Sequence, residues 1–227
     1  MTIAFTDEQK RLVNSYYPGL GTIPPNVGAG GLLGIIEDAF NEAAPAELGT
    51  PDEGAAAGTG VVVTSTEVGH VQKVTLTLTD VEVPLTDEAG VVAYGGLKVF
   101  DWPAGLILFM GAVMDLALTK DAAGVNDDWD GDISLGTVTA SNNATLSSTE
   151  QDLIPTTPTP QAVAGVTTGD GKSTSTEAAK VLDGTATAKD MFLNILVDDA
   201  DHNVGGTATN IIVNGTITFS FLVIGDI

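Results

Sequence analysis

Residues 71–85, VQKVTLTLTDVEVPL, are the stretch that decides the fold. Val74, Leu76 and Leu78 alternate with threonines, which is the period of two expected for a strand with one buried and one solvated face. The β-branched residues of the stretch favour the same conformation. The stretch therefore predicts a long, half-buried β-strand.

A second core strand is predicted at residues 105–119, GLILFMGAVMDLALT, the most apolar run in the chain. Leu106, Leu108 and Met110 can share one face, and Gly111 permits a bulge after which the register changes. A membrane-spanning helix needs about 20 apolar residues, and this run is shorter and contains Asp115. We therefore assign it to the core of a sheet.

From residue 61 onward, threonine, valine and short turns predict an all-β antiparallel sandwich. Residues 190–197 and 210–224 are its most clearly patterned later strands. Asn214-Gly215 lies inside the second of these, either as a kink in one long strand, which we favour, or as a tight hairpin turn. Further short strands are predicted at residues 137–140, near Leu146 and at residues 182–187, with a surface loop at residues 155–176.

Two domains are predicted, an N-terminal arm at residues 1–60 and the sandwich at residues 61–227. Capping and helical spacing of apolar residues predict short α-helices over residues 7–15 and 32–44 of the arm. Small residues at 49–60 predict a flexible linker. Such an arm either covers one end of the sheet or docks on a neighbouring subunit, and both alternatives stay open.

The charge of the chain narrows the classes of partner. Thirty acidic and eight basic residues give a formal net charge of −22, which disfavours nucleic acid and anionic membrane surfaces and suits a basic partner or divalent cations. With no cysteine, disulfides and thiolate metal sites are excluded. The N-terminus lacks the pattern of a secretory signal, so assembly in the cytoplasm is expected.

One acidic segment has the spacing of half a calcium loop. Asp128, Asp130 and Asp132 place carboxylates at alternate positions around Gly131. Thr137 stands where an EF-hand needs a bidentate glutamate, so an EF-hand is excluded. A looser calcium site on the three aspartates and an ordinary acidic turn between strands are the two remaining interpretations.

Candidates for catalysis are few. A second acidic segment, residues 198–203, contains His202 and predicts either a metal or catalytic site or a solvated turn. The other histidine is His70, and no G-x-S-x-G motif accompanies either, so Ser-His-Asp catalysis has no support. A carboxylate-based glycosidase would need aromatic residues in its cleft, and only 5% of the chain is aromatic. Trp102-Pro103 is better explained by packing at a strand end than by ligand stacking. We therefore expect no enzyme activity.

The passages at residues 74–105, 111–165 and 192–226 resemble virion structural proteins of tailed bacteriophages, a similarity that extends over residues 61–226. Within that group the chain is similar to capsid cement or decoration proteins. The resemblance implies a jelly-roll sandwich on the outside of the head and no catalytic residues. It leaves the arm at residues 1–60 without a counterpart.

The resemblance implies a non-enzymatic protein that binds the capsid exterior of the virion and bridges major capsid protein subunits. It is expected to be a homo-oligomer, a trimer by this hypothesis, without a cofactor unless calcium binds. Two alternatives stay open. One is a tail or fibre component of the same composition, and the other is a carbohydrate-binding β-sandwich protein that stacks a sugar on Trp102 or Trp129.

Overall fold

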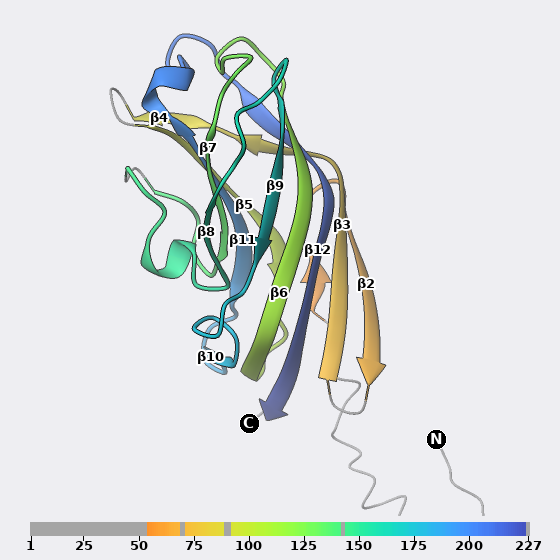
Figure 1. Ribbon diagram of the computed structural model, residues 1–227. Helices are drawn as coiled ribbons and strands as arrows, with labels where there is room; N and C mark the ends of the chain where they lie inside the picture. The colour runs from red at the N-terminus through yellow and green to blue at the C-terminus, as the bar shows by residue number, and fades with distance from the viewer. Residues whose placement is uncertain (1–53, 69–70, 89–91, 142–143, 226–227) are drawn as a thin grey trace, which may run out of the picture. The chain divides into compact units, whose positions relative to one another are not determined.

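The computed structural model describes residues 54–68, 71–88, 92–141 and 144–225. The chain divides into two compact units, Met1–Pro51 and Asp52–Ile227, and every described residue belongs to the second. The helices predicted over residues 7–15 and 32–44 lie outside the described residues. The described part forms two six-stranded antiparallel sheets that share one hydrophobic core, which confirms the predicted all-β sandwich (Figure 1).

The strands divide evenly between the two sheets. Sheet A contains β1 (Ala55–Ala56), β4 (Thr86–Glu88), β5 (Val92–Asp101), β7 (Gly131–Gly136), β8 (Ile154–Pro158) and β11 (Asp190–Asp198). Sheet B contains β2 (Val61–Val68), β3 (Val71–Pro84), β6 (Gly105–Lys120), β9 (Val166–Lys172), β10 (Lys180–Gly184) and β12 (Asn210–Gly225). Two short 3-10 turns are η2 (Ser148–Glu150) and η3 (Asp199–Asp201). No helix within the described ranges is long and apolar enough to cross a membrane.

The strand pairs are nested in the sequence. β3 pairs with β12, β5 with β11, β6 with β9, and β7 with β8, so each pair encloses the next. This is the pairing of one long antiparallel hairpin. Folding that hairpin over places β12 beside β6 and β11 beside β7 and closes the two sheets. Most strand pairs therefore join segments far apart in sequence, whereas β2 with β3 and β4 with β5 are local hairpins.

The predicted alternation of β3 is confirmed. Val74, Leu76 and Leu78 are buried, and the threonines between them lie on the outer face of sheet B. The predicted long strand at the C-terminus is also confirmed, as β12. Gly215 has a φ of +134° and adjoins a register shift in the pairing of β12 with β3, so it forms a bulge within one strand rather than a hairpin turn.

Gly111 has the corresponding role in β6. Its φ is +128°, and the pairing of β6 with β12 shifts register beside it, as predicted from the sequence. On the N-terminal side of this bulge, Leu106, Leu108 and Met110 turn to the outer face while Ile107 and Phe109 are fully buried. The bulge lets both halves of a 16-residue strand keep an apolar side toward the core.

Aromatic rings fill the interior between the sheets. Phe100 of β5 meets Phe219 of β12 edge-on, with ring centroids 4.9 Å apart, so this contact joins sheet A to sheet B. Trp102 packs against both Phe219 and Phe221 at 5.2 and 5.3 Å. The interpretation of Trp102 as a packing residue at a strand end is confirmed.

The loop predicted at residues 155–176 is wrong, because this segment contains β8 and β9. The inward positions of β9 are Thr167, Gly169 and Gly171, so the strand has no hydrophobic pattern. Its glycines leave room for large neighbours: a methyl group on Gly169 would lie 2.4 Å from the side chain of Ile133. The core side chains here come from the facing strands, and β9 itself carries no apolar signal.

The strands predicted at residues 137–140 and near Leu146 are also wrong. Residues 137–141 and 144–153 instead cover the outer face of sheet A, where Ala140 and Leu146 pack with Leu196 in a small second core. The buried side chains of Asn194 and Glu150 hold this cover. The Glu150 carboxylate accepts hydrogen bonds from the N–H groups of Ser141 and Ser147, each at 2.9 Å. Asn194 accepts a hydrogen bond from the N–H of Ala140 at 2.7 Å and donates to the carbonyls of Val138 and Glu150.

Part of the segment predicted as a linker at residues 49–60 belongs to sheet A. Ala55 and Ala56 pair with Asp101 and Phe100 as strand β1, and Ala57 is buried. Small side chains favour this close approach, because a methyl group on Gly54 would lie 2.2 Å from the ring of Phe100. The described sandwich therefore begins N-terminal to the predicted boundary at residue 61.

Candidate functional site

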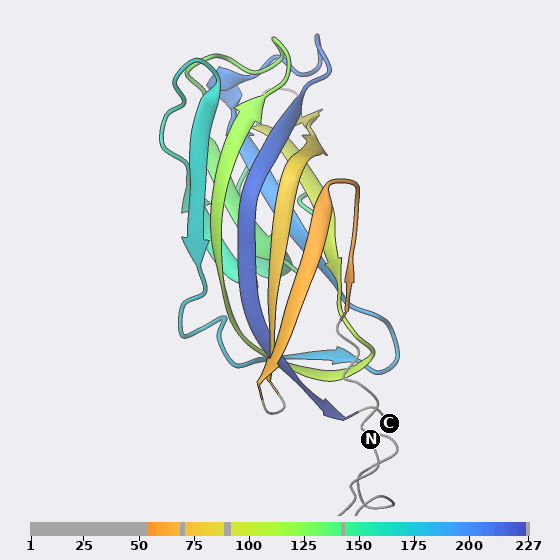
Figure 2. The ribbon, with the colours of Figure 1, turned by 90° about the vertical axis from the view of Figure 1, so that its right-hand side faces the viewer.

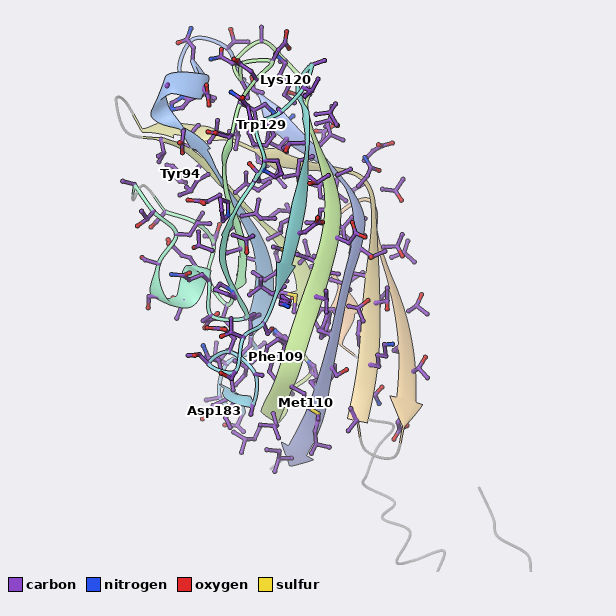
Figure 3. The ribbon with its side chains drawn as sticks, in the orientation of Figure 1. Tyr94, Phe109, Met110, Lys120, Trp129 and Asp183 are labelled. Atoms are coloured by element: carbon purple, nitrogen blue, oxygen red, sulfur yellow. The ribbon has the colours of Figure 1, made fainter. Side chains whose placement is uncertain are left out.

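The structure brings the two acidic segments of the sequence together at one end of the sandwich. β7 begins beside the end of β11, with Gly131 opposite Val197 and Asp132 opposite Leu196. Residues 126–130 precede β7 and residues 199–203 follow β11, so both segments emerge at the same edge. Figure 3 shows this end above the labelled Trp129 and Lys120, opposite the end that carries Met110 and Asp183.

Backbone hydrogen bonds tie the two segments to each other. The N–H of Asp130 donates to the Oδ2 atom of Asp201 at 3.1 Å, and the N–H of Asp198 donates to the carbonyl of Asp130 at 3.2 Å. Asn126 adds a donor to the carbonyl of Asp201 at 2.8 Å. The carboxylate of Asp201 thus accepts a hydrogen bond from a backbone N–H. Such donors offset less of the repulsion among the neighbouring aspartates.

The electrostatics of this acidic end oppose full ionisation. Burial raises the pKa of Asp130, and the carboxylates of Asp198 and Asp201 raise it further. Burial likewise raises the pKa of Asp132, to which Asp130 adds. Partial desolvation, Asp132 and Asp201 together raise the pKa of Asp198. These shifts share one cause: carboxylates gathered where solvent screens them incompletely.

A buried tryptophan and a lysine anchor the loop before β7. Trp129 is 0% exposed and its Nε1–H donates to the carbonyl of Gly165 at 3.3 Å. The Nζ atom of Lys120 donates to the carbonyl of Val125 at 2.7 Å and lies 2.7 Å from the carboxylate of Asp127. The loop is therefore fixed by its own packing and hydrogen bonds.

Gly131 has a structural explanation different from that of a calcium loop. Its φ is not in the left-handed region, but a methyl group at this position would lie 2.0 Å from the carbonyl oxygen of Leu196. Glycine is needed here because β7 and β11 approach closely. The sequence pattern of alternating aspartates around a glycine therefore arises partly from strand packing.

The predicted calcium ligands do not converge. Asp128 is exposed, Asp130 is half-buried before β7, and Asp132 lies within the strand. Across the described ranges, no group of three or more His, Asp or Glu side chains is arranged to hold a metal ion. Calcium binding by these three aspartates stays a prediction, which a calcium titration of the melting temperature, repeated on Asp128→Asn, checks.

The histidines and tryptophans named as candidates for catalysis or ligand binding do not form a site among the described residues. His70 lies outside the described residues, and His202 is half-buried beside Val125, with which it forms an isolated bridge. Trp102 and Trp129 are 3% and 0% exposed, so neither indole offers a face on which a sugar can stack. Sugar binding through either tryptophan is incompatible with this packing.

The association of the two acidic segments was not predicted from the sequence. The signal that could have indicated it is that both segments adjoin strands. Asp198 directly follows a predicted strand, and Asp130 and Asp132 flank the start of β7, a region that was predicted to be a turn. Asn194 and Glu150 were missed as well. Asn194 was a polar residue inside an apolar run, DMFLNILV, which is the signal of a buried hydrogen-bonding side chain.

Fold and site define an acidic, all-β sandwich protein with a cluster of aspartates at one end. No protein-family model and no curated protein matches the chain. Among solved structures the chain is similar to a carbohydrate-binding module, TmCBM27, studied for its specific recognition of mannan. The two share 8% sequence identity over 74% of this chain and 83% of the module, with a TM-score of 0.26. Similarity at this level assigns neither a ligand nor a site to the chain.

Proposed function

We propose that the chain is a structural protein of a tailed-bacteriophage virion, a non-enzymatic cement or decoration protein with a jelly-roll fold. The observation that carries the proposal is the nesting of four strand pairs, from β3 with β12 to β7 with β8. A long hairpin rolled into two sheets is the arrangement of jelly rolls, a class that includes viral capsid domains. Because one fold hosts many functions, the fold supports the proposal together with the resemblance over residues 61–226.

The distribution of charge supports a place on a particle surface. The acidic end gathers Asp127, Asp128, Asp130, Asp198 and Asp201 around one edge, and Lys120 pairs only with the first of these. Negative charge concentrated away from the attached side of a decoration protein keeps particles apart and repels nucleic acid. The protein binds the outer surface of the head, bridges major capsid protein subunits and stabilises the lattice by mass action, because it binds only the assembled form.

Density-gradient co-sedimentation with genome-filled heads that lack the protein tests this function. We expect saturable binding at a fixed ratio to the major capsid protein and a rise in the temperature at which heads open. A chain that starts at Asp52 tests the predicted role of the N-terminal arm, and we expect it to fold and to lose attachment. Absence of the wild-type chain from heads, with recovery on tails, would replace the proposal by a tail or fibre role.

A further inference from the structure

The central part of the outer face of sheet B differs in charge from the rest of this acidic molecule, including the ends of the same face, where Glu82 and Asp183 are exposed. We define the neutral face as the outward side chains of five strand segments: residues 168–172 of β9, 108–117 of β6, 214–222 of β12, 73–79 of β3 and 62–66 of β2. Figure 2 shows these strands side by side with no described segment across them. Their outward charges are Lys73, Lys172, Asp115 and Asp170, which sum to zero in a chain of net charge −22.

These four charges have no ion-pair partner among the residues that the structure describes. Asp115 and Asp170 stand directly opposite each other on β6 and β9, an arrangement of like charges that destabilises a sheet. Lys73 lies across β12 from them, opposite Ser220. The ion pairs of the described residues all involve Lys98, Lys120 or Lys180, and none involves these four.

The rest of the neutral face is hydroxyl-bearing and apolar. Threonines cover much of it, and those at positions 75 and 218 share a hydrogen bond of 3.1 Å. Val62, Met110 and Val113 are 60%, 47% and 57% exposed on it. On the face itself, Leu108 of β6 and Leu222 of β12 stand directly opposite each other. Strands that are apolar on both sides are typical of sheets covered on both faces.

We propose that a second copy of this chain packs on the neutral face, across a two-fold axis that lies in the face. Lys73 of β3 stands opposite Ser220 of β12, and Asp115 of β6 stands opposite Thr216 of β12. A two-fold axis that passes midway between Lys73 and Asp115, perpendicular to the line joining them, places Lys73 of one copy over Asp115 of the other. Lys73 of each copy then lies over Asp115 and Asp170 of the other. The contact is made twice, as in any isologous interface.

Charge and area both favour a second copy as the occupant. Two molecules of charge −22 repel each other, and the neutral face is a surface on which they meet without adding like charges. The five segments are about 4.8 Å apart and total about 120 Å of strand, which gives a flat area of about 600 Å². A stable interface buries about 600 to 1,000 Å² on each partner, so the face reaches the lower end of the required size. This inference is independent of the capsid assignment.

Sedimentation velocity of the full chain tests the proposal, at concentrations from about 1 to 100 μM and in low salt. We expect a dimer, twice the chain mass of 23.1 kDa. Lys73→Asp and Asp115→Lys should each weaken the dimer about 10- to 100-fold, because each brings like charges together twice. An equimolar mixture of the two variants should regain most of the wild-type association, because both contacts between residues 73 and 115 in the mixed dimer are again between opposite charges, and only one contact, that of the introduced aspartate at position 73 with Asp170, joins like charges.

The charge reversals Lys73→Asp and Asp115→Lys also distinguish a specific contact on the neutral face from repulsion that depends only on net charge. Asp115→Lys lowers the net negative charge, so it would strengthen an association limited only by overall charge. Lys189→Asp is the matched control, since it makes the same charge change outside the neutral face, and it should leave the dimer intact. A monomeric wild type, a trimer, a dimer insensitive to both reversals, or a mixture that fails to associate would each overturn the proposal.

Discussion

The backbone N–H of Asp130 donates a hydrogen bond of 3.1 Å to the carboxylate of Asp201, 71 residues further along the chain. This bond joins the loop before β7 to the turn after β11 and turns two acidic segments into one acidic end. Because burial, together with neighbouring carboxylates, raises the pKa of Asp130 and of Asp198, the acidic end opposes folding electrostatically at neutral pH and must be held by the rest of the sandwich.

Asp130→Asn should stabilise the chain at pH 7 by about 0.5 kcal/mol, because it removes one charge from the acidic end and keeps a group that can hydrogen-bond to Asp201. The pKa of Asp130 is raised on folding, so its contribution to stability is complete below the unfolded value of about 3.9 and is lost as the pH rises through the folded value. Urea unfolding between pH 4 and pH 7 should show a smaller loss of stability with rising pH in the variant.

Asp183→Asn is a control for which the expected change in stability at pH 7 has the opposite sign. Hydrogen bonds from Thr185 lower the pKa of Asp183, so that carboxylate favours the folded state when ionised, and its loss should reduce stability at pH 7. Equal effects of the two substitutions would contradict the assignment of repulsion to the acidic end.

Asn194→Ala should lower the free energy of unfolding by about 2–4 kcal/mol, because it leaves the N–H of Ala140 and the carbonyl of Val138 without their buried partner. Hydrogen exchange should accelerate most at residues 137–141 and 144–153, which Asn194 holds against sheet A through Val138, Ala140 and Glu150. Asn126→Ala, which removes a bond to Ala200 at an exposed position, should cost less than about 0.5 kcal/mol. Uniform acceleration of hydrogen exchange across both sheets would argue against the inference that Asn194 stabilises mainly this segment.

Gly131→Ala should cost about 3 kcal/mol or more, since the added methyl group meets the backbone carbonyl of Leu196 at 2.0 Å. Gly206→Ala is the matched control: its methyl group first meets the side-chain amide of Asn203 at 3.0 Å, and the cost should be below about 1.5 kcal/mol. Thermal unfolding with and without calcium checks the cause. A loss of stability seen only with calcium present would mean that Gly131 shapes an ion-binding loop instead.

Trp129→Ala should destabilise the chain by about 3–5 kcal/mol, because the indole is fully buried and bonded to Gly165. Val163→Ala, at a side chain that is 77% exposed, should change stability by less than about 0.5 kcal/mol. Chemical denaturation measures both. If Trp129→Ala keeps its stability and loses binding to a glycan array, the result would favour the carbohydrate-binding alternative, which the burial of Trp129 argues against.

Several strands were predictable because their signal is local. The alternation around Leu76, the apolar runs of β6 and β11, and the bulge at Gly111 all follow from side-chain spacing within one segment. β9 was not predictable in this way. Its inward glycines carry no hydrophobic signal, and the side chains that fill the space beside Gly169 belong to Ile133 and Leu118 on other strands.

The sequence by itself determined the all-β class, the long strands β3, β6 and β12, and a strongly acidic surface, because each depends on composition or on a period of two within one segment. Only the tertiary structure decided that Asp130 meets Asp201, that Asn194 fastens residues 137–141 and 144–153, and that four charges without ion-pair partners among the described residues share one neutral face. The first two relationships join residues 71 and 54 positions apart in the sequence, which the nested pairing brings together. Their register is chosen by packing of the whole core, which no local pattern encodes.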